Sequence, residues 1–453
     1  MPVYDLVIQG GVVLLPELNK EEKLNIGISQ GVIARLSSDE MEAKDKIDAF
    51  GSYVSPGFID SHMHDEEKED GGIIEKALLR QGVTTAIAGN CGSGPLGAEI
   101  LPFRKEPWVN LGFLTGHKKL REAAGATDRY LPAEQHQVQM MKDLLRKELE
   151  NGSFGLSIGL EYLPNTPISE LEALFEVAVD FKRIWVPVHI REDGPASIRA
   201  TQEILDLAAK WPLRFQISHT GSMTGFGQLK EVLTLIDKAR ASGADVTFDC
   251  YPYDAFCTDL GSAVFDPGFE KRWGKGKESL EVASGLNRGR WLDEEGLFER
   301  LRQEEPECLI IAHVIKQEEV ELCLSHPDCA IASDGLLKGG RGHPRAAGTF
   351  PKALRMLRKM GYSWPEAVRK CTSLPAEMNW LDKGVIKEGL DADLVIFDGE
   401  RLCDKATFTD ELLPPEGIKW VIIGGQKAVK DSEVLGGPKG KLMRRNLFQK
   451  EKN

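Results

Sequence analysis

Short apolar segments alternate with amphipathic segments through the middle of this 453-residue chain. The apolar segments have the length of strands, and the amphipathic ones carry apolar residues at helical spacing. An alternation with about eight strands is typical of a parallel (β/α)8 barrel, the TIM barrel architecture. We therefore predict an α/β protein in which residues 56–384 form such a barrel.

The predicted barrel strands are Gly57–Asp60, Thr84–Ala88, Val109–Leu114, Gly155–Leu160, Trp185–His189, Arg214–His219, Asp245–Cys250, Leu309–His313 and Ala330–Asp334. Helices are predicted between several of them, over Gln137–Glu150, Ile168–Phe181 and Ala196–Lys210. The alternation stops between residues 253 and 307, in a stretch rich in Gly, Lys, Arg and Glu. We interpret residues 253–307 as an insertion over one rim of the barrel.

The sequence patterns at both ends of the chain predict β-strands. Short strand patterns with glycine-containing turns occur at Asp5–Gln9, Val12–Leu15, Asn25–Ile28 and Val32–Leu36, and again at Ala392–Phe397 and Trp420–Gly425. We predict one small sheet domain assembled from residues 1–55 and 385–453. The basic stretch Lys439–Arg445 is interpreted as a solvated end.

The charge and composition of the chain limit the classes of partner and the compartment that we expect for it. The chain has 57 Lys plus Arg and 70 Asp plus Glu, a net charge of −13 that disfavours nucleic acid. None of the eight cysteines forms a C-x-x-C pair, which fits a reducing compartment. The chain shows neither a signal peptide nor an apolar run of the ~20 residues that cross a bilayer. These features predict a cytoplasmic protein without a membrane partner; they leave the oligomeric state open.

Several predicted strands end in residues that bind metals. His62 and His64 follow the first strand and Cys91 the second, while His189, His219 and Asp334 close three later ones. The carboxyl ends of barrel strands converge on one face, so these residues should meet there. Because residues i and i+2 share a side of a strand, His62 and His64 could bind one ion. The alternative is a pair of solvent-facing loop histidines.

The stretch 54–64, VSPGFIDSHMH, resembles the first-strand motif of the amidohydrolase superfamily. Further stretches resemble the N-acyl-D-amino-acid deacylase (D-aminoacylase) family: GVTT at 82–85, GNCG at 89–92, GLSIGLEYLP at 155–164, HIRE at 189–192, ISH at 217–219, YPY at 251–253, SDG at 333–335, HPRAAGTFP at 343–351, TSLPAE at 372–377 and GVIKEGLDADLV at 384–395. The likeness covers about residues 5 to 425, and it is the combination of motifs that makes it specific.

The resemblance implies a distorted barrel flanked by a small β-sandwich made from both termini. It also implies one tightly held zinc ion on Cys91, His189 and His219, and a second, weaker site formed by His62, His64, Cys91 and Asp334. Two imidazoles and a thiolate suit zinc and leave a position for water. A buried apolar cysteine and core histidines are the alternatives for these residues.

The activity implied is hydrolysis of a linear amide, N-acyl-D-amino acid to D-amino acid plus carboxylate. Zinc lowers the pKa of its bound water to about 7, and that water attacks the carbonyl carbon. Asp334 would act as general base and then as general acid, because an amine leaves poorly unless it is protonated. The alternative for Asp334 is an aspartate in a tight turn.

Further residues are candidates for the pocket. By resemblance Arg345 anchors the substrate carboxylate with its planar guanidinium, together with Tyr162. Relatives with a Ser-His-His-Lys sequence place a lysine near that carboxylate, whereas here Gly221 stands at its position. Other candidates are Glu161 as a metal-bridging carboxylate, His117 and His313 as pocket-lining residues at strand ends, and His343, which could simply brace its loop.

Two rival functions remain at this point. A cyclic-amide hydrolase of the hydantoinase or dihydroorotase kind would use the same barrel, but it usually needs a carboxylated lysine that the fourth strand lacks. A catalytically inactive scaffold protein on the same fold typically loses its metal ligands, whereas this sequence retains them. The deacylase interpretation therefore leads, with a small N-acyl amino acid as the partner.

Overall fold

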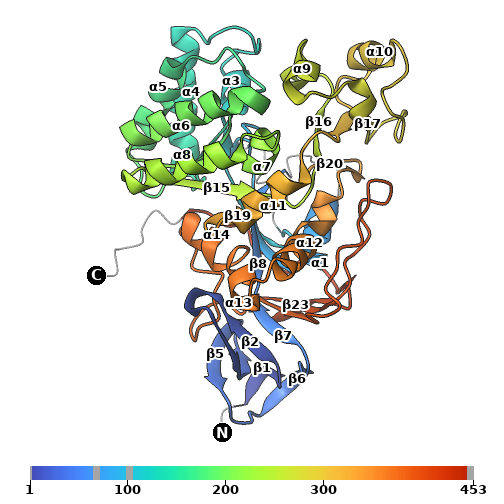
Figure 1. Cartoon of the computed structure of the whole chain (residues 1–453). Coiled ribbons are helices and arrows are strands. Elements are labelled where there is room, and N and C mark those ends of the chain that lie inside the picture. Colours follow the sequence, from blue (N-terminus) through green and yellow to red (C-terminus); the bar gives the residue numbers. More distant parts are fainter. Residues whose placement is uncertain (1–2, 65–71, 98–105, 446–453) are drawn as a thin grey trace.

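Parallel strands form the centre of the computed structural model, which describes residues 3–64, 72–97 and 106–445 (Figure 1). One sheet has the order β10-β9-β8, and a second has the order β11-β12-β13-β14-β15-β19. The strands are β8 (Phe58–Met63), β9 (Val83–Ala88), β10 (Asn110–Phe113), β11 (Thr115–Gly116), β12 (Leu156–Gly159), β13 (Trp185–His189), β14 (Arg214–Ile217), β15 (Val246–Cys250) and β19 (Cys329–Ile331). Together with its helices this is a TIM-barrel-like domain.

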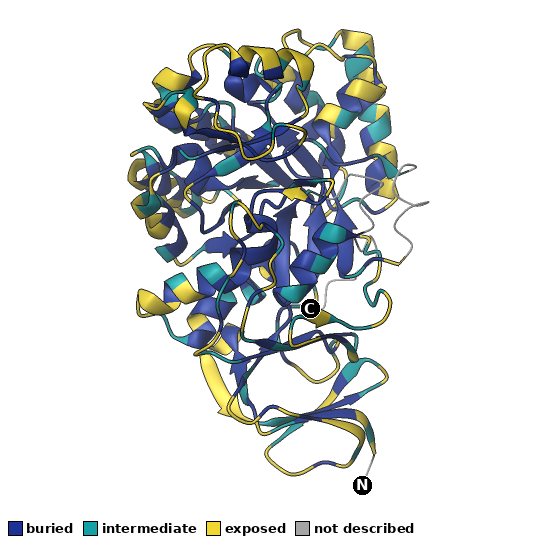
Figure 2. Cartoon of the chain, turned by 90° about the vertical axis from the view of Figure 1, so that its right-hand side faces the viewer, coloured by how far each residue is buried: buried dark blue, intermediate teal, exposed yellow. Residues whose placement is uncertain are grey.

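Helices cover the outside of these strands, at α1 (Ile73–Arg80), α3 (His117–Ala123), α4 (Gln135–Glu150), α5 (Ile168–Ala178), α6 (Ser197–Lys210), α7 (Thr220–Thr224), α8 (Leu229–Ala241), α11 (Gln317–Ser325), α12 (Arg345–Lys359), α13 (Trp364–Arg369) and α14 (Ser373–Met378). Helix α5 illustrates why the helices pack against the strands. Its apolar residues at helical spacing are fully buried, namely Leu171, Leu174, Phe175 and Ala178. Figure 2 shows exposed residues on the outer sides of the helices and buried residues along the central strands. The three helices predicted from the sequence are confirmed to within a few residues.

Residues 256–312, which include most of the predicted insertion, form a separate antiparallel sheet with the order β16-β18-β17. The elements of this segment are β16 (Phe256–Asp259), α9 (Phe269–Trp273), β17 (Leu280–Val282), α10 (Leu297–Glu304) and β18 (Leu309–Ala312). The prediction that residues 309–313 form a barrel strand is therefore wrong, because β15 pairs directly with β19. A short apolar run does not reveal whether its neighbours are parallel or antiparallel.

Strands from the two ends of the chain share one sheet, with the order β25-β24-β23-β22-β7-β2-β3. Its members are β2 (Val12–Leu15), β3 (Lys20–Lys23), β7 (Tyr53–Pro56), β22 (Leu394–Phe397), β23 (Ile418–Ile423), β24 (Gln426–Lys430) and β25 (Glu433–Val434). A second sheet, β5-β4-β1-β6, comprises β1 (Tyr4–Gln9), β4 (Asn25–Ser29), β5 (Val32–Ser37) and β6 (Ala43–Asp48). Buried residues of both, such as Ile8, Ile26 and Ile396, form a hydrophobic cluster separate from that of the barrel-like domain.

The basic stretch 439–445 lies against the barrel-like domain, so its interpretation as a solvated end is wrong. The backbone N–H of Leu111 donates to the carbonyl of Lys441, and the Arg445 guanidinium donates to three backbone carbonyls. Arg445 pairs with backbone carbonyls and not with acidic side chains, so no pattern of charges in the sequence indicates this contact. Among the described residues, no helix is both long and apolar enough to span a bilayer.

Candidate metal centre and active site

The predicted metal ligands lie in or directly after five parallel strands, and they lie close together. His62 lies in β8 with His64 just beyond it, and Cys91 follows β9. His189 is the last residue of β13, while His219 and Asp334 follow β14 and β19. The residues thus meet at the carboxyl ends of the strands, where barrels carry their active sites.

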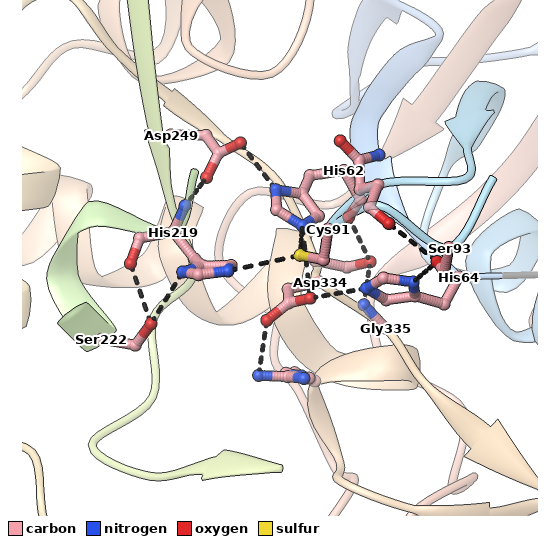
Figure 3. Close-up of polar contacts among 12 residues, drawn as sticks. His62, His64, Cys91, Ser93, His219, Ser222, Asp249, Asp334 and Gly335 are labelled. Carbon is pink, nitrogen blue, oxygen red and sulfur yellow. Dashed lines mark hydrogen bonds and ion pairs between the residues drawn. The ribbon is translucent and has the colours of Figure 1, made fainter. Parts of the chain in front are cut away.

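Two overlapping groups of ligand atoms form there. Figure 3 shows His62, His64 and Asp334 around Cys91, with His219 on its other side. In the group Cys91, His189 and His219, and in the group His62, His64, Cys91 and Asp334, all ligand atoms lie within 4.8 Å of one another. The Sγ of Cys91 lies 3.4 Å from Nε2 of His62 and 3.5 Å from Nε2 of His219. Cys91 therefore belongs to both groups.

Each of the four histidines has a partner for the nitrogen that faces away from the ligand cluster. Nδ1 of His62 lies 3.0 Å from Asp249, Nδ1 of His64 lies 3.1 Å from Ser93, and Nδ1 of His219 lies 3.1 Å from Ser222. The fourth, His189, places its Nε2 2.9 Å from Glu161. Such partners fix the tautomer and orientation of metal-binding imidazoles.

The backbone is strained at three of these positions. Cys91, His219 and Asp334 have φ angles of 52°, 34° and 47°, a left-handed conformation that residues with side chains rarely adopt. Such conformations cost of order 1–3 kcal/mol each and gather at functional sites. Asp249 stabilises one of them, because its carboxylate accepts a hydrogen bond from the backbone N–H of His219.

The charges favour the ionised forms of Cys91 and Asp334. Burial alone would raise the pKa of the Cys91 thiol, but the imidazoles of His62 and His219 hold it well below its usual value. Burial opposes ionisation of Asp334 too, yet the Arg345 guanidinium, followed by His219 and His62, holds the pKa of this carboxyl well below its usual value. The site therefore presents a thiolate and a carboxylate.

The donor set fits a zinc ion. A thiolate and two imidazoles are a common zinc-binding combination, and three protein ligands leave one position for substrate or water. Nδ1 of His189 is buried and makes no hydrogen bond among the described residues, which suits a metal ligand. The second group adds a carboxylate and two imidazoles around the same thiol.

A small cavity of about 20 Å³ lies beside the ligand cluster. Tyr162 lines it, with its ring 4.6 Å from that of His189 and its hydroxyl 3.3 Å from Thr258. Glu161 and Asp193 also line the cavity, as two buried carboxylates. Burial and the neighbouring Glu161 raise the pKa of Asp193 to about 7.

Arg345 is buried behind Asp334 and is not among the residues that line the cavity. Its Nη1 lies 2.9 Å from Oδ2 of Asp334, and its Nη2 donates to the carbonyl of Cys257. The guanidinium also lies over the ring of Tyr251, 4.7 Å from its centre. The guanidinium of Arg345 therefore contacts the predicted base and does not reach the cavity.

The other candidate histidines lie outside both ligand groups. His117 begins α3 and contacts the buried Glu170 at 2.8 Å. His313 contacts Glu281 at 3.2 Å in the insertion, and His343 contacts the carbonyl of Ala255 and accepts a hydrogen bond from the backbone N–H of Arg345. Glu161 reaches His189 and Arg272 and belongs to neither ligand group.

Sequence reasoning missed three of the residues that contact the histidines, Asp249, Ser93 and Ser222, and it named Glu161 for a different role. Asp249 lies near the end of a correctly predicted strand, so the strand-end argument could have found it. Ser93, Ser222 and Asp193 carry no comparable signal, because isolated serines and acids are common in loops.

Comparisons with known proteins identify the family. A model of the amidohydrolase family matches residues 311–428. N-acyl-D-glutamate deacylase from Alcaligenes xylosoxydans xylosoxydans is 31% identical over 98% of this chain and 97% of its own length. The chain belongs to the N-acyl-D-amino-acid deacylase family. The N-acyl-D-aspartate deacylase of the same organism is 31% identical over 86% of this chain and 84% of its own length.

Solved structures agree with this membership of the deacylase family. N-acyl-D-glutamate deacylase from Bordetella bronchiseptica, crystallised with zinc and a phosphonate mimic of the tetrahedral intermediate, has a TM-score of 0.87 at 27% identity and covers 98% of this chain and 100% of its own. A D-aminoacylase, described as having a binuclear centre with one-metal activation and second-metal attenuation, has a TM-score of 0.85 at 26% identity, with the same coverage. A D-hydantoinase, at 15% identity and a TM-score of 0.64, shares the fold alone.

Proposed function

We propose that this protein is a zinc-dependent hydrolase that cleaves N-acyl-D-amino acids, or close analogues, to a D-amino acid and a carboxylate. The observation that carries this proposal is the meeting of Cys91, His189 and His219 beside Asp334 in a member of the deacylase family. Two family members act, by their names, on N-acyl-D-glutamate and N-acyl-D-aspartate. The amide of a small N-acyl amino acid is thus the bond to be broken.

Cys91, His189 and His219 would hold one zinc ion tightly, and His62, His64, Cys91 and Asp334 would form the weaker second site. Bound zinc polarises a carbonyl and makes water acidic enough to attack near neutral pH. The partners of the histidines, Glu161 and Ser222 in the first group, keep the donor nitrogens aimed at the centre. The protein's contribution is thus a set of oriented donors beside a small cavity.

Asp334 is the proposed general base and acid. Its carboxylate is ionised by its contacts with Arg345 and the histidines, so it can accept a proton from the attacking water. It then delivers that proton to the amide nitrogen, which leaves as an amine. One carboxylate can serve both steps because it holds the proton taken from the water until the amine leaves.

Substrate binding is proposed to involve Tyr162, whose ring lies on the cavity wall, and Arg345. For Arg345 to reach a substrate carboxylate, its ion pair with Asp334 must open or be shared. No lysine or arginine is among the described residues that line the cavity. The position of a lysine in Ser-His-His-Lys relatives is occupied here by Gly221.

The architecture proposed for this activity is a distorted, closed (β/α)8 barrel at residues 56–384, with an insertion at 253–307 and a β-sandwich of residues 1–55 and 385–453. Two hydrogen bonds support closure: the N–H of Asp334 donates to the carbonyl of His62, and the N–H of His64 donates to that of Gly335. Both bonds lie within the candidate site, so closing the barrel would also hold Asp334 against His62. A cytoplasmic location is proposed from the free cysteines.

The test combines metal analysis with substrates paired by handedness. Purified wild-type protein should contain about one tightly bound zinc ion per chain, as a three-ligand site predicts. It should hydrolyse N-acetyl-D-amino acids and leave their L-enantiomers intact, measured by chiral chromatography of the released amino acid. Zinc-loaded protein that cleaves neither enantiomer would overturn the proposal, and cleavage of hydantoin or dihydropyrimidine rings would favour the cyclic-amide alternative.

A further inference from the structure

Two consecutive residues of the insertion contact the wall of the cavity. Nη2 of Arg272, in α9, lies 3.2 Å from Oε1 of Glu161, and Nε of the same arginine lies 2.8 Å from Oδ1 of Asp193. The indole N–H of Trp273 donates to Oδ2 of Asp193. The insertion is therefore bonded to the segments that follow β12 and β13.

Glu161 connects these contacts to the metal ligands. Its Oε1 faces Arg272, while its Oε2 lies 2.9 Å from Nε2 of His189. Both Glu161 and Asp193 are at least 96% buried, so each needs a partner for its charge. Among the residues that the structure describes, Arg272 is the only lysine or arginine paired with either carboxylate.

We propose that Arg272 is a positioning residue that holds Glu161 against His189, so that the insertion sets the affinity of the Cys91, His189 and His219 site for zinc. The inference rests on the proposed function, because it takes zinc as the ion bound there. Carboxylates that orient metal-binding histidines typically contribute 10–100-fold in metal affinity. Without Arg272, the two buried carboxylates lack the cation between them, so Glu161 turns away from His189.

The rival role for Arg272 is direct contact with substrate, which its position beside the cavity allows. Measurements of KM and of zinc binding distinguish the two roles. A substrate contact changes KM and leaves zinc binding as it is, because the free enzyme binds zinc without substrate. A positioning role changes zinc binding in the absence of any substrate.

The experiment measures the zinc dissociation constant of the full chain by competition with a chromophoric chelator. We expect Arg272→Met and Glu161→Gln each to weaken zinc binding by about 10–100-fold. The double variant should bind zinc no more weakly than Glu161→Gln alone, because both changes remove the same interaction. Arg272→Lys, which keeps the charge, should recover most of the loss.

Arg302→Met is the matched control. Arg302 lies in the same insertion and forms an ion pair with Asp266 at 2.6 Å, with a partly exposed side chain like that of Arg272. Its hydrogen bonds go to Phe265, Ser262 and Asp266, none of which lines the cavity. The zinc affinity of Arg302→Met should equal that of the wild type. A loss of zinc affinity as large as that of Arg272→Met would indicate general loosening of the insertion and overturn the proposal.

Failure of this inference can be told from failure of the proposed function. Wild-type protein that binds no zinc would contradict the proposed function itself. Tight zinc binding by both wild type and a folded Arg272→Met, or additive losses in the double variant, would contradict the inference alone. If Arg272→Met does not fold, Glu161→Gln and Arg272→Lys still test the proposal. Unchanged zinc affinity in Glu161→Gln would overturn it.

Discussion

A β-carbon on Gly221 would lie 2.6 Å from the Sγ of Cys250, closer than real β-carbons approach other atoms. Gly221 lies in α7 directly after the ligand His219, and Cys250 ends the neighbouring strand β15. The thiol thus fills the space that any side chain at position 221 would need to cross.

This packing predicts coupling between the two positions. Gly221→Ala should lower the free energy of unfolding by about 1–2 kcal/mol, because overpacking a core outweighs the gain in helix propensity. Removing the thiol as well, in Gly221→Ala/Cys250→Ala, should be less destabilising than the sum of the two single changes. Chemical denaturation of the four proteins measures this coupling, and strict additivity would show that the thiol moves aside freely.

Cys91→Ala should lose zinc and activity together, since Cys91 is the one residue common to both ligand groups. Zinc content after dialysis and the initial rate on an N-acetyl-D-amino acid measure the two effects. Cys371→Ala is the control, because Cys371 is equally buried and lies outside both groups. A Cys91→Ala protein that keeps its zinc would remove the thiol from the proposed site.

Asp334→Asn should keep its tightly bound zinc but lose a factor of about 10² or more in kcat, the usual contribution of a general base. The amide preserves the shape of the side chain but removes its negative charge, and with it the ion pair with Arg345 and the capacity to accept and return a proton. Rates measured at equal zinc content test this directly. Near-normal kcat in a zinc-loaded Asp334→Asn protein would assign the proton transfer to another group.

Glu170 supplies a prediction for acid stability. It is buried and receives hydrogen bonds from His117 and from Arg121 at 2.7 and 2.8 Å. Burial alone would raise its pKa, but these contacts lower it from its usual 4.5 to about 2. Since the folded-state pKa is the lower one, the stabilisation is complete above about pH 4.5 and is lost as the pH falls toward 2.

Glu170→Gln should accordingly lower the free energy of unfolding by roughly 3 kcal/mol at pH 7, because it breaks a buried ion pair. Between pH 4.5 and 2 its stability should fall less steeply than that of the wild type. Glu176→Gln, on the same helix and paired with Lys142 on the surface, should cost less than about 1 kcal/mol. Parallel pH slopes for the wild type and Glu170→Gln would contradict the assignment.

The sequence predicted the strand-end residues well and their surroundings poorly. The carboxyl ends of parallel strands must meet, so His62, Cys91 and Asp334 could be placed together without coordinates. The orientation of an arginine is set by the packing of its own element: Arg345 begins α12 and turns back to Asp334, which no spacing reveals. The run 309–312 has the composition of a barrel strand, yet it pairs with β16 and β17 in an antiparallel sheet.

The central claim is that a thiolate and two imidazoles share one zinc ion. X-ray absorption spectroscopy at the zinc edge of the wild-type protein, loaded with about one equivalent, tests this most directly. The account predicts one sulfur neighbour at about 2.3 Å and nitrogen neighbours at about 2.0–2.1 Å, and loss of the sulfur signal in any zinc retained by Cys91→Ala. A zinc spectrum with only oxygen and nitrogen neighbours in the wild-type protein would contradict it.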